Sequence, residues 1–301
     1  MNNELKGTIC VLICVSLWAL IPVVAKLGQS NLDNHQFLFW SSLVSFCVMA
    51  VLVLIKGTVW HLMRYSVGDW LRISCLGLLG TYVYYLFLYL GYDQAAGIEV
   101  LVTQYSWPIQ IVLFSMIFLK ERLTLKKSLS IILGLIGVML VLTKGNLNQI
   151  NISNPSVIAL VGAGATCFAL FSVFSKKVNK EPLGVIAVYF LVACVASFIS
   201  MLCLSEFAFP SSDEIPAVLI NGTLVNGISY VFWLTALKAT EASYLAVYTF
   251  LTPVLSAIYL IVFFDEVFIA AYGFGLFLVL AGGIINSVSS RTNRSNLSPE
   301  K

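Results

Sequence analysis

Stretches of about 20 apolar residues recur along the whole 301-residue chain and constrain its fold more than any other feature. An α-helix rises about 1.5 Å per residue, so about 20 residues cross a hydrocarbon core of about 30 Å. Ten stretches of this kind are present: 7–28, 35–55, 70–91, 96–119, 125–143, 155–176, 184–204, 214–236, 243–264 and 267–288. The sequence therefore predicts an all-α membrane protein with ten transmembrane helices.

The composition agrees with this fold class and argues against several functions. Hydrophobic residues make up 59% of the chain and charged residues only 10%, against about 25% charged in soluble domains. The seven cysteines lie within apolar stretches without metal-type spacing, so neither a disulfide framework nor a metal site is indicated. No stretch carries an HExxH or DxxxD pattern, which leaves an intramembrane enzyme as a remote alternative, and no charged rings indicate a channel. No cofactor is expected.

Lysine and arginine predict the orientation of the chain in the membrane. With the N-terminus in the cytoplasm, 15 of the 17 cations fall on the cytoplasmic side, and only Lys26 and Lys144 fall outside. This asymmetry follows the positive-inside rule. It predicts a multi-pass protein of the bacterial cytoplasmic (inner) membrane with both termini in the cytoplasm. The cations are spread over loops at the height of lipid headgroups, so membrane lipid is an expected partner and nucleic acid is not.

The chain also resembles itself. Residues 16–29 align with 166–179 at an offset of 150, which places Lys26 opposite Lys176. Further on the offset is 145, and it pairs Tyr85 with Tyr230, Pro108 with Pro253, Glu121 with Glu266 and Gly137 with Gly282. We expect a first five-helix unit at 1–146, a second at 147–290 and a cytoplasmic tail at 291–301. Because five is odd, the second unit starts on the other side of the membrane, which gives two inverted repeats, an architecture of secondary transporters.

Several short motifs carry a family resemblance. The segments WALIPVVAK at 18–26, QYSWP at 104–108, LKERLT at 119–124 and FDEVFI at 264–269, within two five-helix repeats, together resemble the EamA-type drug/metabolite transporter superfamily. The likeness is strongest to its bacterial branch of aromatic and other amino-acid exporters. The resemblance implies a central cavity lined by spans one, three, four, six, eight and nine, with spans five and ten packed outside it.

Span four carries a polar face. Glu99, Thr103, Ser106 and Gln110 recur at helical spacing, with Trp107 beside them. Polar groups at depth in a membrane usually face the bundle or a watery cavity. Glu99 is interpreted either as a carboxylate that binds a substrate ammonium or takes up a proton, or as an acid near the helix end that snorkels to the headgroups.

Prolines interrupt three of the predicted spans. Pro22, Pro108 and Pro253 lie in spans one, four and nine, and each removes a backbone N–H and frees a carbonyl about one turn earlier. Broken backbone within a membrane is tolerated where it is buried or lines a cavity. We interpret the three prolines as hinges, against the alternative of ordinary packing kinks.

Aromatic and amide side chains in the remaining spans complete the predicted substrate site. Such walls suit flat or cationic solutes, whereas the alternative is aromatic packing between helices. The predicted substrate-binding residues are Trp18, Tyr82, Tyr85, Tyr89, Glu99, Thr103, Tyr105, Ser106, Trp107, Asn226, Tyr230, Trp233 and Tyr248.

Other features favour a structural role. Lys26 and Lys176 end matching helices and are expected to snorkel. Glu121 and Glu266 precede the fifth and tenth helices and are expected to act as charges favoured by those helix dipoles. Gly134 and its counterparts in span ten allow close helix contact, either within the chain or between the protomers of a homodimer.

These features together predict a secondary transporter of a small metabolite. Amino-acid export by alternating access is the leading interpretation, with solute stacked against Tyr82, Tyr85, Trp107 and Trp233. Uptake of a quaternary amine such as choline through an aromatic cage is the alternative. The sequence does not decide between them.

Overall fold

The computed structural model describes residues 3–95, 97–146, 154–264 and 268–295, and within these ranges the chain forms helices joined by loops and turns. Ten segments are long and apolar enough to cross a membrane: Asn3–Gly28, Asn34–Ile55, Val67–Gln94, Glu99–Leu119, Leu125–Leu142, Pro155–Ser175, Pro182–Leu204, Ile215–Ala239, Ala242–Phe264 and Ala270–Val288. The ten predicted spans are thus confirmed, with bounds that differ by a few residues.

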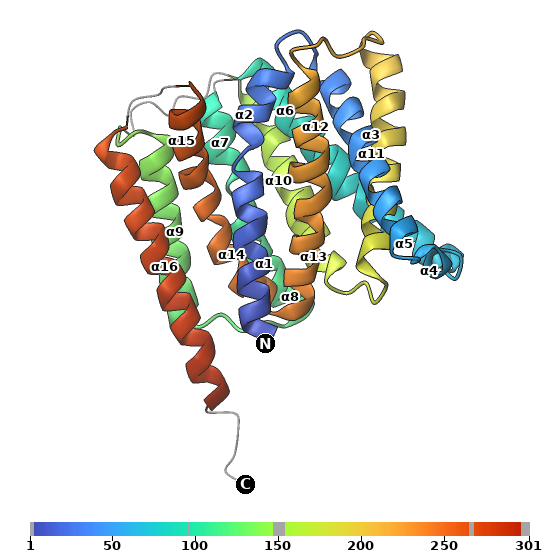
Figure 1. The fold of residues 1–301 in the computed structure, drawn as a ribbon. Coiled ribbons are helices and arrows are strands. Elements are labelled where there is room, and N and C mark those ends of the chain that lie inside the picture. Colours follow the sequence, from blue (N-terminus) through green and yellow to red (C-terminus); the bar gives the residue numbers. More distant parts are fainter. Residues whose placement is uncertain (1–2, 96, 147–153, 265–267, 296–301) are drawn as a thin grey trace.

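Several spans consist of more than one helix (Figure 1). The helices are α1 (Asn3–Trp18), α2 (Ile21–Gly28), α3 (Asn34–Ile55), α4 (Val59–Leu62), α5 (Val67–Gly77), α6 (Tyr84–Gln94), α7 (Gly97–Gln104), α8 (Trp107–Leu119), α9 (Leu125–Leu142), α10 (Pro155–Ser175), α11 (Pro182–Leu204), α12 (Ile215–Ile220), α13 (Ser229–Ala239), α14 (Ala242–Thr249), α15 (Leu251–Phe264) and α16 (Ala270–Ser295). Two π-helical segments, η1 (Leu78–Val83) and η3 (Asn221–Ile228), lie within spans three and eight.

The helix bounds repeat at the offset seen in the sequence. The first residues of α6 and α13 are 145 residues apart, and so are their last residues. The same holds for α7 and α14. The starts of α9 and α16 and the ends of α8 and α15 follow the same offset, and the π-helical segments η1 and η3 end 145 residues apart. Together with the odd number of spans in each half, these matching bounds are what an inverted repeat requires.

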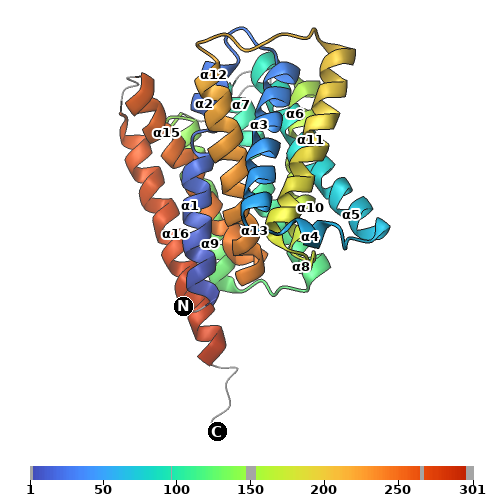
Figure 2. The same cartoon turned by 45° about the vertical axis from the view of Figure 1, so that its right-hand side comes forward.

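Helix packing follows the same symmetry. Helix α1 packs against α13 and α14, and its counterpart α10 packs against their counterparts α6 and α7. Counterparts also pair with each other, α9 with α16 and α3 with α11. Figure 1 shows α9 and α16 at one edge of the bundle and α3 and α11 towards the other, with α1, α10 and α13 between the two pairs; Figure 2 shows α5 beyond α3 and α11. The centre of the molecule is therefore formed by spans one, three, four, six, eight and nine.

Glycine allows the outer pair to approach closely. A Cβ atom on Gly137 would lie 2.8 Å from the carbonyl oxygen of Gly275, and one on Gly275 would lie 2.7 Å from the carbonyl oxygen of Gly137. A Cβ on Gly134 would fall 2.3 Å from the ring of Phe250. The small residues of α9 and α16 thus serve packing within this chain.

A buried carboxylate connects the two halves at the end of the bundle opposite Asn3, which we call the distal end. Glu214 accepts hydrogen bonds from the backbone N–H groups of Asn31 (2.8 Å) and Leu32 (2.9 Å), and from the N–H (2.9 Å) and hydroxyl (2.8 Å) of Ser211. Burial opposes the ionisation of Glu214, but these hydrogen bonds prevail and lower its pKa to about 2.

At the end that carries Asn3, the amino-terminal end, a matching contact lies 145 residues earlier. Asp69 accepts hydrogen bonds from the N–H (3.0 Å) and hydroxyl (2.9 Å) of Ser66, and it forms an ion pair with Lys180 at 2.7 Å. Lys180 belongs to the loop between spans six and seven, whereas Asn31 and Leu32 belong to the loop between spans one and two. We call the contacts of Asp69 and Glu214 the two clasps. Both clasps are present in the same structure.

Glu214→Gln is expected to destabilise the protein at neutral pH. The folded-state pKa of about 2 lies below the ordinary 4.5, so the stabilisation is complete above pH 4.5 and is lost as pH falls towards 2. The pKa difference corresponds to about 3 kcal/mol as an upper value. Thermal unfolding of the purified variant and wild type should differ most at pH 7 and least near pH 3. The control is Glu206→Gln, which changes an exposed acid of the same loop. A difference in melting temperature between Glu214→Gln and wild type that is the same at both pH values would contradict the lowered pKa of Glu214.

Candidate functional site

Three spans are broken near the middle of the bundle. Helix α1 gives way to α2 at Ala19 and Leu20, α7 to α8 at Tyr105 and Ser106, and α14 to α15 at Phe250. Each second helix carries a proline in its first turn: Pro22, Pro108 or Pro253. A proline has no N–H to donate, so the carbonyl four residues earlier lacks its helical partner. The breaks therefore lie where the sequence predicts them, and the movement of these segments as hinges stays a prediction.

The repeat is not kept at the first of these breaks. At the offset of 150, Pro22 corresponds to Ser172, which lies inside the continuous helix α10. Spans four and nine are thus both broken, as a symmetric pair. Span one is broken as well, whereas its counterpart, span six, is a continuous helix.

The breaks of spans one and four lie beside a group of four aromatic side chains, Trp18, Trp107, Phe168 and Trp233, which we call the aromatic cluster. The ring centre of Trp18 lies 6.0 Å from that of Trp107, 5.6 Å from Phe168 and 5.3 Å from Trp233. Trp107 lies 5.0 Å from Phe168 at nearly right angles, a preferred geometry of aromatic pairs. All four side chains are buried. The cluster thus joins spans one, four, six and eight.

Hydrogen bonds fix the two indole rings that face each other in spans one and eight. The indole N–H of Trp18 donates to the hydroxyl of Ser229 at 2.8 Å, and that of Trp233 donates to the hydroxyl of Ser172 at 3.2 Å. A buried indole N–H without a partner would be costly. These serines therefore hold the rings of the cluster in place.

The space inside the cluster is small. A cavity of about 10 Å³ is lined by Trp18, Ile21, Tyr84, Tyr85, Gln104, Tyr105, Trp107, Phe168 and Thr252. This volume is close to that of a single water molecule. The sequence predicts aromatic walls around an open pocket, whereas the structure shows the rings packed on one another.

Sequence reasoning missed the three polar residues Tyr84, Gln104 and Thr252 around this small cavity. Gln104 donates to the hydroxyl of Tyr84 at 3.0 Å, which fixes both side chains. Thr252 is 4% exposed, and its hydroxyl has no hydrogen-bond partner within the described part of the chain. An isolated threonine among apolar residues gives no pattern in sequence, although its place next to Pro253 was a usable signal. Thr252 is the buried polar group at this point that remains available for a ligand.

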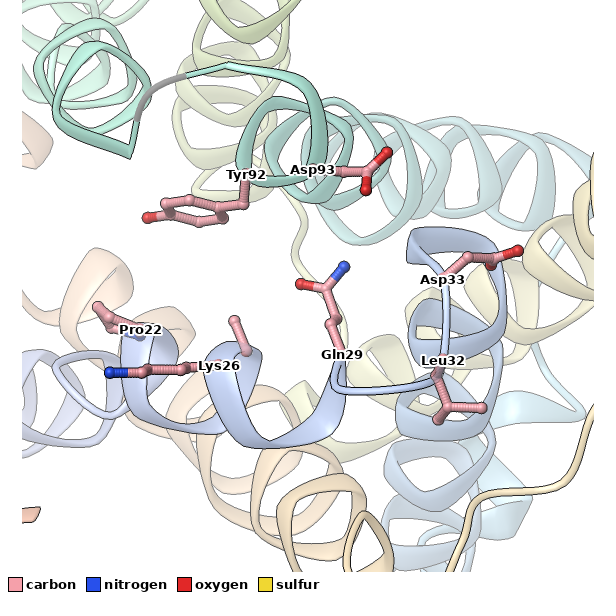
Figure 3. Close-up of a pocket in the computed structure, with 8 residues that line it drawn as sticks. Pro22, Lys26, Gln29, Leu32, Asp33, Tyr92 and Asp93 are labelled. Carbon is pink, nitrogen blue, oxygen red and sulfur yellow. The ribbon is translucent and has the colours of Figure 1, made fainter. Parts of the chain in front are cut away.

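Two larger cavities lie above the cluster at the distal end. One, of about 380 Å³, is lined by Pro22, Ala25, Lys26, Gln29, Leu32, Asp33, Tyr92 and Asp93 (Figure 3). The other, of about 520 Å³, is lined by Pro22, Leu101, Val141, Leu142, Lys144, Pro253, Ser256, Ala257, Leu260 and Tyr272. They share Pro22, and their linings continue directly into that of the small cavity, from Pro22 to Ile21 and from Pro253 to Thr252. The distal cavities and the small cavity are thus lined by neighbouring residues of α2 and of α15.

At the amino-terminal end, charged side chains connect helices that are far apart in the sequence. Glu121 accepts hydrogen bonds from the N–H groups of Ala242 and Ser243, both at 2.9 Å, and from the hydroxyl of Ser243 at 2.6 Å. Lys127 forms an ion pair with Glu241 and donates to Ser243. Glu121 was expected to act on the dipole of the following helix, α9, but it binds the start of α14. Its counterpart Glu266 lies outside the described residues.

Lys176 closes the same end in a way that the sequence did not predict. Its ammonium group donates to the carbonyl oxygen of Leu237 at 2.7 Å and to that of Thr240. Burial lowers its pKa from the ordinary value, although the carboxylates of Glu121 and Glu241 act in the opposite direction. The expectation that Lys176 snorkels is therefore wrong, because the end of span eight provides its partners.

The remaining predicted site residues lie in several places. Tyr85 and Tyr105 line the small cavity. Tyr89 accepts a hydrogen bond from Asn221 at 3.1 Å, and Tyr230 donates to the carbonyl of Gly80 at 3.0 Å. Tyr82 and Thr103 are half-buried.

Three polar side chains of the prediction require separate mention. Glu99 is 5% exposed, so its side chain is buried within the protein. Ser106 accepts a hydrogen bond from Gln110 at 3.0 Å. Asn226 is fully buried, and among the described residues its amide has no hydrogen-bond partner.

Tyr248 lies apart from the aromatic cluster. Its hydroxyl shares hydrogen bonds with Tyr244 at 2.9 Å and with Ser287, and Tyr244 contacts Thr8 at 2.9 Å. These residues connect α1, α14 and α16 in the amino-terminal half of the bundle. Tyr248 also lines a groove of about 210 Å³ on the side of the bundle, together with Leu12, Leu280 and Ile284. Its position favours a structural role.

A bundle of ten apolar spans, three of them broken near cavities at its distal end, is the architecture of a multi-pass membrane transporter. Comparison with known proteins gives the family. The model of the EamA-like transporter family matches this chain twice, over residues 5–143 and 155–288. The chain therefore belongs to the EamA-like transporter family, and the predicted membership is confirmed.

Relatives and a solved structure agree with this assignment. An uncharacterized transporter of Archaeoglobus fulgidus is 24% identical over 86% of this chain and 89% of its own length. The aromatic amino acid exporter YddG of Ancylobacter novellus is 27% identical over 62% of this chain and 65% of its own length. A protein of known crystal structure superposes with a TM-score of 0.85 at 20% identity, covering 96% of this chain and 99% of its own, which shows the fold.

Proposed function

We propose that this transporter exports an amino acid with an aromatic side chain by alternating access. One observation carries the proposal: the aromatic cluster lies at the breaks of spans one and four, next to Thr252 of span nine, between the distal cavities and the charged contacts of the amino-terminal end. A transporter that works by alternating access must bind its solute near the middle of the bundle, where the two halves meet. The aromatic cluster lies at that point.

The state described here is the one in which solute is released to the distal side. The cavities above the cluster connect to the distal end, whereas Glu121, Lys127 and Lys176 hold the other end closed. The space within the cluster, about 10 Å³, is too small for a solute. Rotation of the half-helices at Pro22, Pro108 and Pro253 would separate the rings and open the path from the other side.

The chemistry of the cluster supports an aromatic solute. An additional ring between Trp18, Trp107 and Trp233 would gain about 0.5 to 1.5 kcal/mol per ring pair beyond the burial of its surface. The hydroxyl of Thr252 and the freed carbonyl groups near the breaks would meet the carboxylate and the ammonium of an amino acid. The likeness to the YddG exporter supports the same class of solute.

The orientation is part of the proposal. We infer that the amino-terminal end faces the cytoplasm and the distal end the outside of the cytoplasmic membrane, because 15 of the 17 lysines and arginines lie on the amino-terminal side of the predicted topology. In this orientation the described state faces outward, which is the release state of an exporter.

Transport in vesicles tests the proposed solute. The purified protein in lipid vesicles is expected to carry radiolabelled tryptophan or phenylalanine, and unlabelled aromatic amino acids should compete with it. Thr252→Val should raise the KM about tenfold, because it removes a polar partner of the solute while it keeps the shape of the side chain. Carriage of choline but of no amino acid would favour uptake of a quaternary amine and overturn the proposal.

Glu99→Gln tests the role predicted for that carboxylate. If Glu99 binds the solute ammonium or takes up a proton, the variant should lose most of its transport or its pH dependence. Glu206→Gln, which removes the carboxyl group of an exposed glutamate, serves as the control. Unchanged transport over pH 5 to 8 would leave Glu99 with a structural role only.

A further inference from the structure

The structure assigns a second ammonium-binding site, formed by the backbone carbonyl groups of Tyr92 and Ala95 at the end of α6. We propose that Lys26 binds there when the distal end closes, as Lys176 binds the end of α13 at the amino-terminal end in the state described here. The proposal rests on the alternating access proposed above, but not on an amino acid as the solute.

The site that holds Lys176 provides the template. The ammonium group of Lys176, at the end of span six, binds the carbonyl oxygens of Leu237 and Thr240 at the end of span eight. The last carbonyl groups of a helix have no partner within it, so they are natural acceptors for an ammonium group. This contact requires three features: a lysine at the end of one span, free carbonyl groups at the end of another span, and a short distance between the two spans.

The first half of the chain contains the same lysine and the same helix end. Lys26 corresponds to Lys176 at the offset of 150, and α6 corresponds to α13 at the offset of 145. The second offset relates Leu237 to Tyr92 and Thr240 to Ala95.

The backbone at the two helix ends is also alike. Ala95 has φ −139° and ψ 164°, and Thr240 has φ −149° and ψ −176°. The N–H of Ala95 donates to Gly91 at 2.9 Å, and that of Thr240 donates to Ala236 at 3.1 Å. The carbonyl groups at the end of α6 are therefore already arranged as those that hold Lys176.

In the described state Lys26 lies elsewhere. Its ammonium group lies over the ring of Phe264, 4.0 Å from the ring centre, and its side chain is exposed. Figure 3 shows Lys26 and Tyr92 on opposite sides of the distal cavity, which both of them line. The approach of spans one and three is thus the missing feature, and closure of the cavity would supply it.

The two clasps show that this difference between the ends is not a general loss of symmetry. Asp69 and Glu214 also lie 145 residues apart, and each is bound to its serine and to the neighbouring loop. Contacts that are present at both ends belong to the fixed part of the molecule. The lysine contact is formed at one end only, as expected for a gate that alternates.

Crosslinking across the distal cavity tests the proposal without any solute. In a variant whose seven native cysteines are replaced, Gln29→Cys and Asp93→Cys place thiols on opposite sides of the opening (Figure 3). The rate of disulfide formation under a mild oxidant then reports how often the distal end closes in the full chain in vesicles.

Lys26→Met removes the ammonium group and keeps the apolar stem. We expect it to slow crosslinking about tenfold, since two hydrogen bonds from a charged donor are lost in the closed state only. Lys26→Arg should retain most of the wild-type rate. Lys176→Met should act in the opposite direction and speed crosslinking about tenfold, and the double variant should return towards the wild-type rate. Lys56→Met, at an exposed lysine elsewhere, is the control and should change nothing.

The outcomes separate this proposal from the proposed solute. An unchanged crosslinking rate in Lys26→Met overturns the second ammonium site, and so does the absence of crosslinking in every variant. The expected rate changes without transport of any amino acid would support the gate and overturn the solute.

Discussion

Replacing Gly222 by alanine is expected to lower the free energy of unfolding by about 3 kcal/mol, at the upper end of the usual cost of overpacking. A Cβ atom on Gly222 would lie 2.5 Å from the Cβ of Val44 and 2.7 Å from the carbonyl oxygen of Ser41. Both obstacles are close to the backbone of α3, so they cannot move as a flexible side-chain end would. The hydrogen bond from Ser45 to the carbonyl of Gly222, 2.9 Å long, fixes the same contact.

Thermal unfolding in detergent and the yield of monodisperse protein measure this effect. The matched control is Gly273→Ala in α16, where the new Cβ would meet only Phe268 at 3.7 Å, an ordinary van der Waals distance. Because alanine favours a helix over glycine by about 1 kcal/mol, the control should be as stable as wild type or slightly more so. Equal melting temperatures for the two variants would show that spans two and eight are not as closely packed as described.

The spans and their breaks could be predicted because each depends on local chemistry. An apolar stretch of the right length must form a helix in lipid, since unpaired backbone groups have no water to bind there. A proline inside an apolar stretch removes one helical hydrogen bond, so Pro108 and Pro253 mark the broken spans without any knowledge of their neighbours. The offset of 145 could be read for the same reason, because matched residues occupy matched helices.

The state of the site could not be read in this way. The sequence contains Trp18, Trp107 and Trp233 whether their rings line an open pocket or pack on one another. Which end of the bundle is closed depends on contacts between segments far apart in sequence. Lys176 shows this plainly, because its partners Leu237 and Thr240 are backbone carbonyl groups, which every residue type carries.

Thr252 illustrates a second limit. A threonine hydroxyl in a helix usually binds a carbonyl of the preceding turn, as Thr81 does with Gly77 at 2.7 Å. Thr252 stands just before Pro253, beyond the break at Phe250; it lines the small cavity, and its hydroxyl has no such bond among the described residues. The sequence shows the proline, but only the fold shows that the hydroxyl is left for a ligand.

Trp18→Ala is expected to reduce the transport of an aromatic amino acid at least 30-fold. Trp18 contacts the other three members of the aromatic cluster and also Tyr230, whose ring centre lies 6.2 Å away. Truncation of a central tryptophan at a binding site costs about 2 kcal/mol or more, which corresponds to about 30-fold in affinity. The effect should appear in the KM for solute in vesicles, measured on protein that elutes as a single folded species.

Conservative and distant variants distinguish a binding role from a structural one. Trp18→Phe keeps a ring in the cluster but loses the hydrogen bond to Ser229, so it should retain more transport than alanine does. Trp60→Ala changes a tryptophan that is 70% exposed at the amino-terminal end, and it should leave the KM unaltered. If Trp18→Ala lowers the melting temperature but keeps the wild-type KM, the cluster only fills space, and the solute must pass by another route.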